Sequence, residues 1–269
     1  MPRHERKRKP SRRSCRNATV IGPLAQLRIA AGLLTRLPVG AAQAWPDGAV
    51  ARAAWAFPLV GAALGLAAAL VQALGLWSGL PPVLAAILAV GLLVVATGAL
   101  HEDGLADTGD ALGTARQRAR ALEIMRDSRI GTFGALALGL VTASRIAAIA
   151  ALATADLVPA LVTAATLSRL AMVWLMAALP PARVDGLAAA AGRPDRRVVM
   201  LASGLGVAIA AVVAGPLAAA SQVLVAAALA ALLARWFQQR LGGHTGDTLG
   251  ATQQLVEAAL LIAWVAALR

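Results

Sequence analysis

The sequence predicts an all-α protein, a polytopic transmembrane helical bundle of about seven spans. Three observations lead to this prediction. Of the 269 residues, 59% are hydrophobic and 14% are charged, whereas soluble globular chains are about 45–50% apolar and about 25% charged. The mean hydropathy is +0.72. The apolar residues also gather in runs of about 20, the length that an α-helix needs to cross a bilayer.

The apolar runs follow one another along the chain and define the expected spans. No charged residue lies between Arg52 and His101, and the turn-prone sequence SGLPP divides this stretch into two spans. Five further runs follow, of which the last is short for a full span. The expected spans lie near 54–77, 82–100, 134–154, 157–179, 198–217, 221–237 and 255–268. Residues 20–269 are therefore expected to form a single integral-membrane domain.

The distribution of basic residues predicts the orientation in the membrane. Residues 1–16 contain eight Lys and Arg side chains against one Glu, and we interpret residues 1–19 as a disordered basic tail rather than a nucleic-acid-binding arm. Loops rich in Lys and Arg alternate with loops that lack them, and cytoplasmic loops are the basic ones. We expect a multi-pass protein of the cell inner membrane, with its N-terminus and its polar motifs in the cytoplasm.

The acidic residues are concentrated in one segment. Six of the 13 Asp and Glu residues lie between positions 102 and 127. Asp103, Asp107 and Asp110 are spaced i, i+4, i+7, so on a helix they share one face, where like charges repel. Hard oxygen ligands without cysteine or paired histidine favour Mg²⁺ or Mn²⁺. The segment predicts a divalent-cation site, and an exposed acidic loop is the alternative.

Arginines follow these acids directly along the chain. Guanidinium groups bind phosphate oxygens in a bidentate manner, so arginines beside a metal site indicate an anionic, phosphate-containing substrate. Taken alone, the same residues are also explained as topology signals of a cytoplasmic loop. The arginines of this segment are Arg116, Arg118, Arg120, Arg126 and Arg129.

A second polar motif, GGHTGDTLG at residues 242–250, precedes the last apolar run. Thr245 either caps the following helix or binds substrate. Beyond the motif, Glu257 lies inside an apolar run, where an ionisable group is costly and tends to be functional. Arg145 and Arg169 also lie within apolar runs, and we expect them to face the bundle interior and to pair with acids.

These motifs resemble those of the adenosylcobinamide-GDP ribazoletransferase, or cobalamin (5′-phosphate) synthase, family. The matching segments extend from about residue 24 to the end of the chain. They are LTRLPV at 34–39, FPLVG at 57–61, HEDGLADTGD at 101–110, LEIMRDSRIGTFG at 122–134 and the motif at 242–250. The chain differs from the family pattern at Ala111, where glycine is frequent, and at Glu102, where an apolar residue is frequent.

The resemblance implies a Mg²⁺-dependent transfer in cobamide biosynthesis. Adenosylcobinamide-GDP would react with α-ribazole or α-ribazole 5′-phosphate to give GMP and adenosylcobalamin or its 5′-phosphate. The expected catalytic and metal-binding residues are Asp103, Asp107, Asp110 and Asp127. The expected substrate-binding residues are Arg36, Arg126, Ser128, Arg129, Arg169, His244, Thr245 and Asp247.

Two alternatives belong to other classes. A lipid enzyme similar to the CDP-alcohol phosphotransferases also uses an Asp-Gly-containing carboxylate cluster, but its pattern has an Ala-Arg pair where Ala106 is followed by Asp107. A cation transporter would place its carboxylates deep within the spans, whereas most of them are expected at the ends of the spans. The expected partners are the two substrates and the lipid bilayer, without nucleic acid, and no oligomeric state is predicted.

Overall fold

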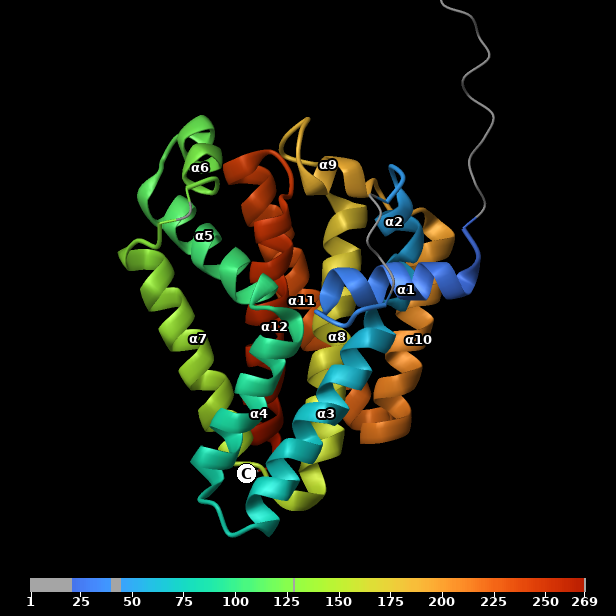
Figure 1. Cartoon of the computed structure of the whole chain (residues 1–269), viewed down its shortest axis with the longest axis vertical. Helices are drawn as coiled ribbons and strands as arrows, with labels where there is room; N and C mark the ends of the chain where they lie inside the picture. Colours follow the sequence, from blue (N-terminus) through green and yellow to red (C-terminus); the bar gives the residue numbers. More distant parts are fainter. Residues whose placement is uncertain (1–20, 40–44, 128, 269) are drawn as a thin grey trace, which may run out of the picture.

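The computed structural model describes residues 21–39, 45–127 and 129–268, and Figure 1 shows their arrangement as a bundle of helices. The predicted all-α class is confirmed, because these residues form α-helices and two short 3-10 turns, with a single isolated β-bridge. The predicted tail at 1–19 lies outside the described residues. The helices are α1 (Pro23–Leu34), α2 (Ala49–Ala53), α3 (Phe57–Trp77), α4 (Pro82–Thr97), α5 (Leu100–Thr114), α6 (Arg118–Ile124), α7 (Thr132–Ala150), α8 (Leu157–Ala178), α9 (Leu187–Ala191), α10 (Arg196–Ala214), α11 (Pro216–Leu241) and α12 (Gly246–Ala267).

The described residues contain six helical segments that are long and apolar enough to cross a membrane. α4 and α5 pass the same test together although they meet at 91°, which makes seven if the bent pair counts as one span. The prediction of about seven spans is therefore confirmed. The six segments are Ala49–Trp77, Thr132–Ala150, Thr154–Ala178, Arg196–Ala214, Pro216–Leu241 and Gly246–Ala267.

The bend between α4 and α5 corrects the predicted span at 82–100. α4 ends at Thr97 because Gly98 and Ala99 both adopt left-handed backbone conformations, with φ of 64° and 57°. A residue with a Cβ enters this region only at a cost. The new helix then starts at Leu100 and leads away from α4 toward α6 (Figure 1). The bend therefore sets the direction of the helix that carries the acidic motif.

The last span is longer than predicted. The sequence suggested a short helix at 255–268, but α12 begins at Gly246 and has 22 residues. A capping box starts it, in which the Thr245 side chain accepts from the Thr248 backbone N–H and the Thr248 hydroxyl accepts from the Thr245 N–H. The prediction was wrong about the start because the polar motif at 242–250 was placed before the helix, whereas Thr248, Gln253 and Gln254 are helical and buried against other helices.

α8 lies at the centre of the bundle and is buried along most of its length. It packs against α3, α10, α11 and α12. α3 approaches it most closely at Gly61 and Gly65, where a Cβ would collide with the backbone carbonyls of Ala165 and Leu161. Small residues allow helix backbones to approach in this way when no hydrophobic force drives helices together in lipid.

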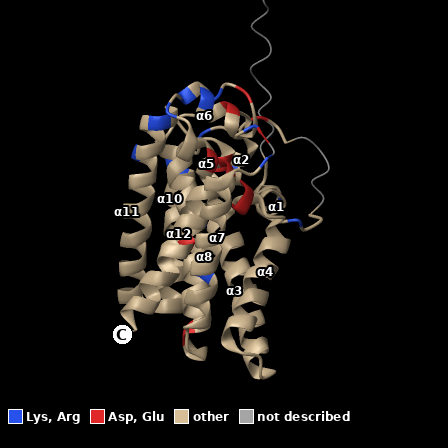
Figure 2. Cartoon of the chain, turned by 90° about the vertical axis from the view of Figure 1, so that its left-hand side faces the viewer, with Lys and Arg blue, Asp and Glu red and all other residues tan. Residues whose placement is uncertain are grey.

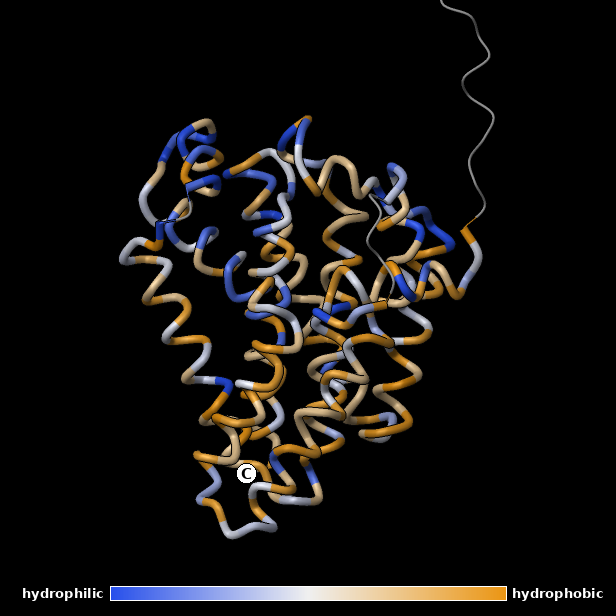
Figure 3. The backbone as a smooth tube through the Cα atoms, viewed as in Figure 1, coloured by the Kyte–Doolittle hydropathy of each residue, from blue (hydrophilic) through white to orange (hydrophobic). Residues whose placement is uncertain are grey.

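Most of the charged residues that the structure describes gather at one end of the bundle, as Figure 2 shows for Arg, Asp and Glu. Figure 3 shows the same division by hydropathy, with hydrophobic helix shafts below a hydrophilic end. The connections at the opposite end, at 78–81, 151–156 and 215, contain no Lys or Arg. We call the charged end, which holds α6, α9 and the first turn of α12, the polar end.

Candidate functional site

The first turns of α5 and α12 lie directly against each other. A Cβ on Gly104 would lie 2.7 Å from the carbonyl oxygen of Asp247, and a Cβ on Gly250 would lie 3.2 Å from the Cα of His101. Gly104 therefore allows a backbone contact that a side chain would prevent, and Gly250 allows a close approach that a Cβ would tighten. This contact brings the Asp-containing motif of α5 to the Asp-containing motif that starts α12, although about 140 residues separate them in the chain.

Three carboxylates surround this contact, and we call Asp103, Asp107 and Asp247 the carboxylate face. Asp103 is exposed, while Asp107 and Asp247 are partly buried. Asp107 lies close enough to Asp103 and Asp247 to be repelled by their charges. The charge of Asp110 also repels Asp107. Partly buried like charges favour binding of a cation or a proton between them. The predicted grouping of Asp103 and Asp107 on one helix is thus extended by Asp247.

Asp110 points to a different partner. Its two carboxylate oxygens accept the backbone N–H groups of Gly131, at 2.6 Å, and Gly134, at 2.8 Å, at the start of α7. The side chain is 6% exposed, and a Cβ on either glycine would collide with it. An anion is favourable at a helix N-terminus, where backbone N–H groups lack partners. Asp110 therefore joins α5 to α7.

Asp127 and the arginines beside it lie on the surface of the polar end. Arg129 donates to both carboxylate oxygens of Asp127, and these hydrogen bonds lower the pKa of Asp127 to about 2. Arg126 donates to both oxygens of Asp185, at 2.9 and 2.8 Å. Each arginine thus already has a carboxylate partner. Ser128 lies outside the described residues.

Arg36 lies near the bend between α4 and α5. Its backbone N–H donates to the carbonyl oxygen of Ala96 at 2.7 Å. Its exposed side chain crosses Gly98, where a Cβ would collide with the guanidinium group. The described contacts of Arg36 are therefore with the bend rather than with the carboxylate face.

The four predicted metal ligands are not gathered at one point. Within the described residues, no group of three or more His, Cys, Asp or Glu side chains lies close enough to hold a metal ion. Mg²⁺ usually keeps several waters and binds one or two protein carboxylates together with substrate phosphates. Asp103 and Asp107, with Asp247 opposite, provide a donor set of that kind. The metal-binding roles of Asp110 and Asp127 stay predictions.

The loop between α8 and α9, residues 179–186, borders the carboxylate face, and we call it the pinned loop because two backbone hydrogen bonds hold it to the segment before α12. The Ala182 N–H donates to the His244 carbonyl oxygen at 2.7 Å, and the His244 N–H donates to the Pro180 carbonyl oxygen at 2.9 Å. These two bonds join the loop after α8 to the 242–245 segment. The His244 side chain is 1% exposed, and its burial lowers its pKa from 6.5 to about 4, so the imidazole is neutral at pH 7.

Thr245 caps α12, and this confirms one of the two roles considered for it. Its hydroxyl also donates to the Asp247 carboxylate at 3.2 Å. The cap and this hydrogen bond fix Asp247 at the first turn of the helix. A substrate-binding role for Thr245 and His244 stays a prediction.

Arg183 is a site residue that the sequence analysis did not single out. It lies in the pinned loop, donates to the Leu122 carbonyl oxygen at 2.9 Å, and is a cationic neighbour of both Asp107 and Asp247. In the sequence, Arg183 is one of several arginines in a basic loop, and the excess of positive charge in cytoplasmic loops already explains such a residue. The structure adds a positive charge to the border of the carboxylate face.

A network of buried charges lies deeper in the bundle, and Glu257 is its centre. Arg145 donates to one oxygen of Glu257 at 2.6 Å, and Arg169 donates to the other. Both arginines are 1% exposed. The expectation that they face the interior and pair with acids is confirmed. Arg169, which was predicted to bind substrate, has its described contacts in this network.

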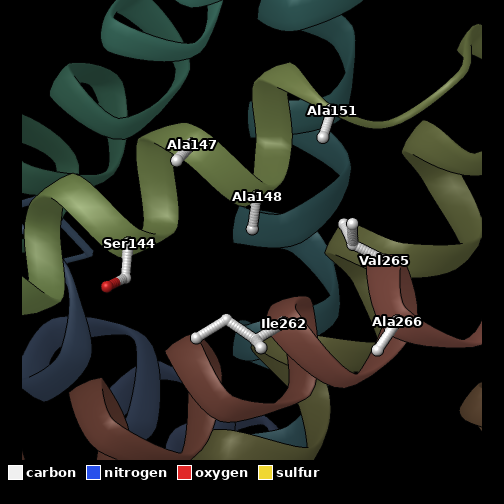
Figure 4. Close-up of a pocket in the computed structure, with 7 residues that line it drawn as sticks. All are labelled: Ser144, Ala147, Ala148, Ala151, Ile262, Val265 and Ala266. Atoms are coloured by element: carbon white, nitrogen blue, oxygen red, sulfur yellow. The ribbon is translucent and has the colours of Figure 1, made fainter.

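An apolar crevice lies at the opposite end of the spans. It has a volume of about 530 Å³ and opens between the C-terminal halves of α7 and α12 (Figure 4). Ser144 provides its single polar side chain, and the other six lining residues are Ala, Ile or Val. Its lining therefore offers no carboxylate, guanidinium or imidazole group.

Comparisons with known proteins identify the family of the chain. The family model described as cobalamin-5-phosphate synthase matches residues 26–265. A protein of Bradyrhizobium diazoefficiens named adenosylcobinamide-GDP ribazoletransferase is 46% identical, over 91% of this chain and 94% of its own length. Proteins with the same name in Sinorhizobium medicae and Azorhizobium caulinodans are 47% and 44% identical, over 80% and 89% of this chain and 86% and 94% of their own lengths. No solved structure matches the chain. The chain belongs to the cobalamin-5-phosphate synthase family.

Proposed function

We propose that the carboxylate face is the catalytic centre at which this chain, a transferase of cobalamin biosynthesis, joins adenosylcobinamide-GDP with α-ribazole or its 5′-phosphate. The relatives carry the name of this reaction. The observation that supports the location is the contact between Gly104 and Asp247, which places the carboxylates of α5 and α12 together at the polar end. A multi-pass membrane protein thus presents its acidic motif where a water-soluble nucleotide can reach it.

The reaction breaks the phosphoanhydride bond of the pyrophosphate and forms a phosphoester bond to the acceptor. A ribose hydroxyl of the acceptor attacks the phosphorus that bears the cobinamide, the bond from this phosphorus to the bridging oxygen breaks, and GMP leaves with that oxygen. The hydroxyl proton passes to solvent or to a carboxylate of the face. An acceptor that carries a 5′-phosphate keeps it in the product. Phosphoryl transfer of this kind depends mainly on positioning and on neutralisation of charge.

Asp103 and Asp107 would hold Mg²⁺ in this centre, and Asp247 would face them. When bound, Mg²⁺ neutralises the charge of the pyrophosphate and of the departing GMP. Arg183 would supply a further positive charge from the pinned loop. Arg126 and Arg129 would bind phosphate only after exchange of their present partners, Asp185 and Asp127, for substrate oxygens.

We also place the polar end in the cytoplasm and the bundle in the cell inner membrane. The basic connections lie at this end, and the opposite connections lack Lys and Arg. Cytoplasmic loops carry this excess of positive charge. GMP and both substrates would then exchange directly with the cytoplasm.

The family assignment favours the transferase over the lipid enzyme and the cation transporter. The buried charges also argue against a transporter. Glu102 and Glu257 lie within the bundle, but Arg145 and Arg169 pair with them. Two glutamates and two arginines leave no net negative charge to attract a transported cation.

The experiment is an assay of GMP release from adenosylcobinamide-GDP by the purified protein in lipid vesicles. We expect release to require both α-ribazole, or its 5′-phosphate, and Mg²⁺, and to yield one cobamide per GMP. EDTA should abolish it, and added Mg²⁺ should restore it. Release at the full rate without an acceptor would show a hydrolase and contradict the proposed function. Full activity in EDTA would contradict the metal.

A further inference from the structure

Four helices meet at the buried charges around Glu257. Glu257 and Gln254 come from α12, Arg145 from α7, Arg169 from α8 and Glu102 from α5. All five side chains are buried. Besides the two arginines, Gln253 donates to Glu257 at 2.6 Å. We call this group the buried network.

Hydrogen bonds connect Glu257 to α5, the helix that carries Asp103 and Asp107. Arg145 binds Glu257 through one nitrogen, and through another it donates to Gln254 at 2.8 Å and to Glu102 at 3.3 Å. Gln254 in turn donates to the same oxygen of Glu102 at 2.9 Å. Glu102 is the residue directly before Asp103. The network therefore holds the first turn of α5 from both α7 and α12.

α5 carries four carboxylates in 15 residues and leaves α4 at 91°, so it is not the straight continuation of a span. Contacts with α12 and α7 set its direction: the packing of Gly104, the hydrogen bonds of Asp110 and, at its first turn, the buried network. Buried ion pairs add little net stability compared with well-packed apolar residues. Stability alone therefore does not explain these ionisable groups within the membrane bundle, where such groups tend to be functional.

We propose that Glu257 is a positioning residue for this transfer: through Arg145 and Gln254 it fixes Glu102, and thereby sets Asp103 and Asp107 opposite Asp247. The inference rests on the proposed function for the reaction whose rate it affects. Its mechanical part, the fixed direction of α5 relative to α12, does not depend on that function. A shift of about 1 Å in a reacting group lowers turnover about 100-fold.

The first part of the test measures turnover per folded molecule for two variants. Glu257→Gln removes the central charge, and Gln254→Leu removes contacts to Glu102 and Arg145 without removing a charge. We expect turnover to fall at least about 10-fold for the first and at least about threefold for the second, with KM values for both substrates within about threefold. Glu257→Gln combined with Arg169→Gln restores neutrality, and its turnover should recover in part.

Two control variants separate this role from general damage. Gln72→Leu replaces a buried polar side chain of α3 outside the network, and Glu123→Gln removes an exposed carboxylate that pairs with Arg120. Both should keep turnover within twofold of the wild type. If Glu257→Gln lowered only the yield of folded protein, while each folded molecule turned over at the wild-type rate, the positioning role would be overturned.

The second part measures the direction of α5 without an assay of activity. Cys15 is the single cysteine, so a Cys15→Ser chain accepts spin labels at Thr114→Cys and Gly246→Cys, both exposed. We expect a narrow distance distribution in the otherwise unchanged chain and a broader or shifted one with Glu257→Gln or Gln254→Leu. Unchanged distributions would overturn the inference even if the protein performed the proposed reaction. Absence of GMP release from the wild type, with broadened distributions in the variants, would contradict the proposed function alone.

Discussion

Gly104 of α5 faces the backbone of Asp247 at the start of α12, and a Cβ at position 104 would lie 2.7 Å from the Asp247 carbonyl oxygen. That distance leaves no room for even the smallest side chain. A backbone contact thus joins the two acidic motifs. It holds α5 and α12 together, so the carboxylates of Asp103, Asp107 and Asp247 stay on one face.

Gly104→Ala should separate the two helices. The added methyl group overpacks the contact, which costs about 1–3 kcal/mol of stability, and we expect turnover to fall at least about 10-fold because Asp103 and Asp247 move apart. The measurement is GMP release per folded molecule. Gly91→Ala in α4 is the matched control, since a Cβ there meets nothing within 4 Å. Equal turnover for the two variants would contradict the importance of the contact.

Asp110→Asn should destabilise the protein. The amide retains one acceptor oxygen but places an NH₂ group against the backbone N–H of Gly131 or Gly134, so one buried donor at the start of α7 loses its partner. The expected loss is about 1–3 kcal/mol, measured as a lower unfolding midpoint in detergent. Unchanged stability together with a higher Mg²⁺ requirement would instead favour the predicted metal-binding role of Asp110.

Arg183→Gln should weaken binding of the pyrophosphate substrate. A hydrogen bond to a charged group contributes about 1.5–3 kcal/mol, so KM for adenosylcobinamide-GDP should rise about 10- to 100-fold. KM for α-ribazole, which carries no phosphate, should stay within about twofold. Arg193→Gln is the control, because Arg193 is exposed and bonded to the Ala177 carbonyl oxygen. A parallel rise in both KM values would show that Arg183 acts only by holding the loop to α6.

Much of the fold could be predicted from the sequence because the bilayer imposes one length and one composition on every span. Most span ends differ from the prediction by a few residues, the largest differences being at α11 (Pro216–Leu241 against 221–237) and at the start of α12, and two of the differences have a clear local reason. The left-handed backbone at Gly98 and Ala99 ends α4 early, and Thr245 starts α12 nine residues before the expected apolar run. Neither a bend nor the burial of polar residues against other helices is visible in hydropathy alone.

The carboxylate face was only partly predictable. Helical spacing placed Asp103 and Asp107 together, but the same spacing also grouped Asp110 with them, whereas the oxygens of Asp110 bind the start of α7. Asp247 was expected at the site only through the family resemblance, and Arg183 was not singled out, because the positions of both depend on contacts between segments far apart in the chain. Contacts of this kind have no local signature, and the paired glycines at 104 and 250 are understood only after the helices are seen together.

The most direct test of the central claim is the rate of GMP release by Asp103→Asn in lipid vesicles supplied with α-ribazole and Mg²⁺. Loss of a metal-binding carboxylate should lower the rate at least about 100-fold, whereas Glu123→Gln, an equal change of charge on α6, should leave it within twofold. A folded Asp103→Asn protein that released GMP at the wild-type rate would contradict the assignment of the carboxylate face as the catalytic centre.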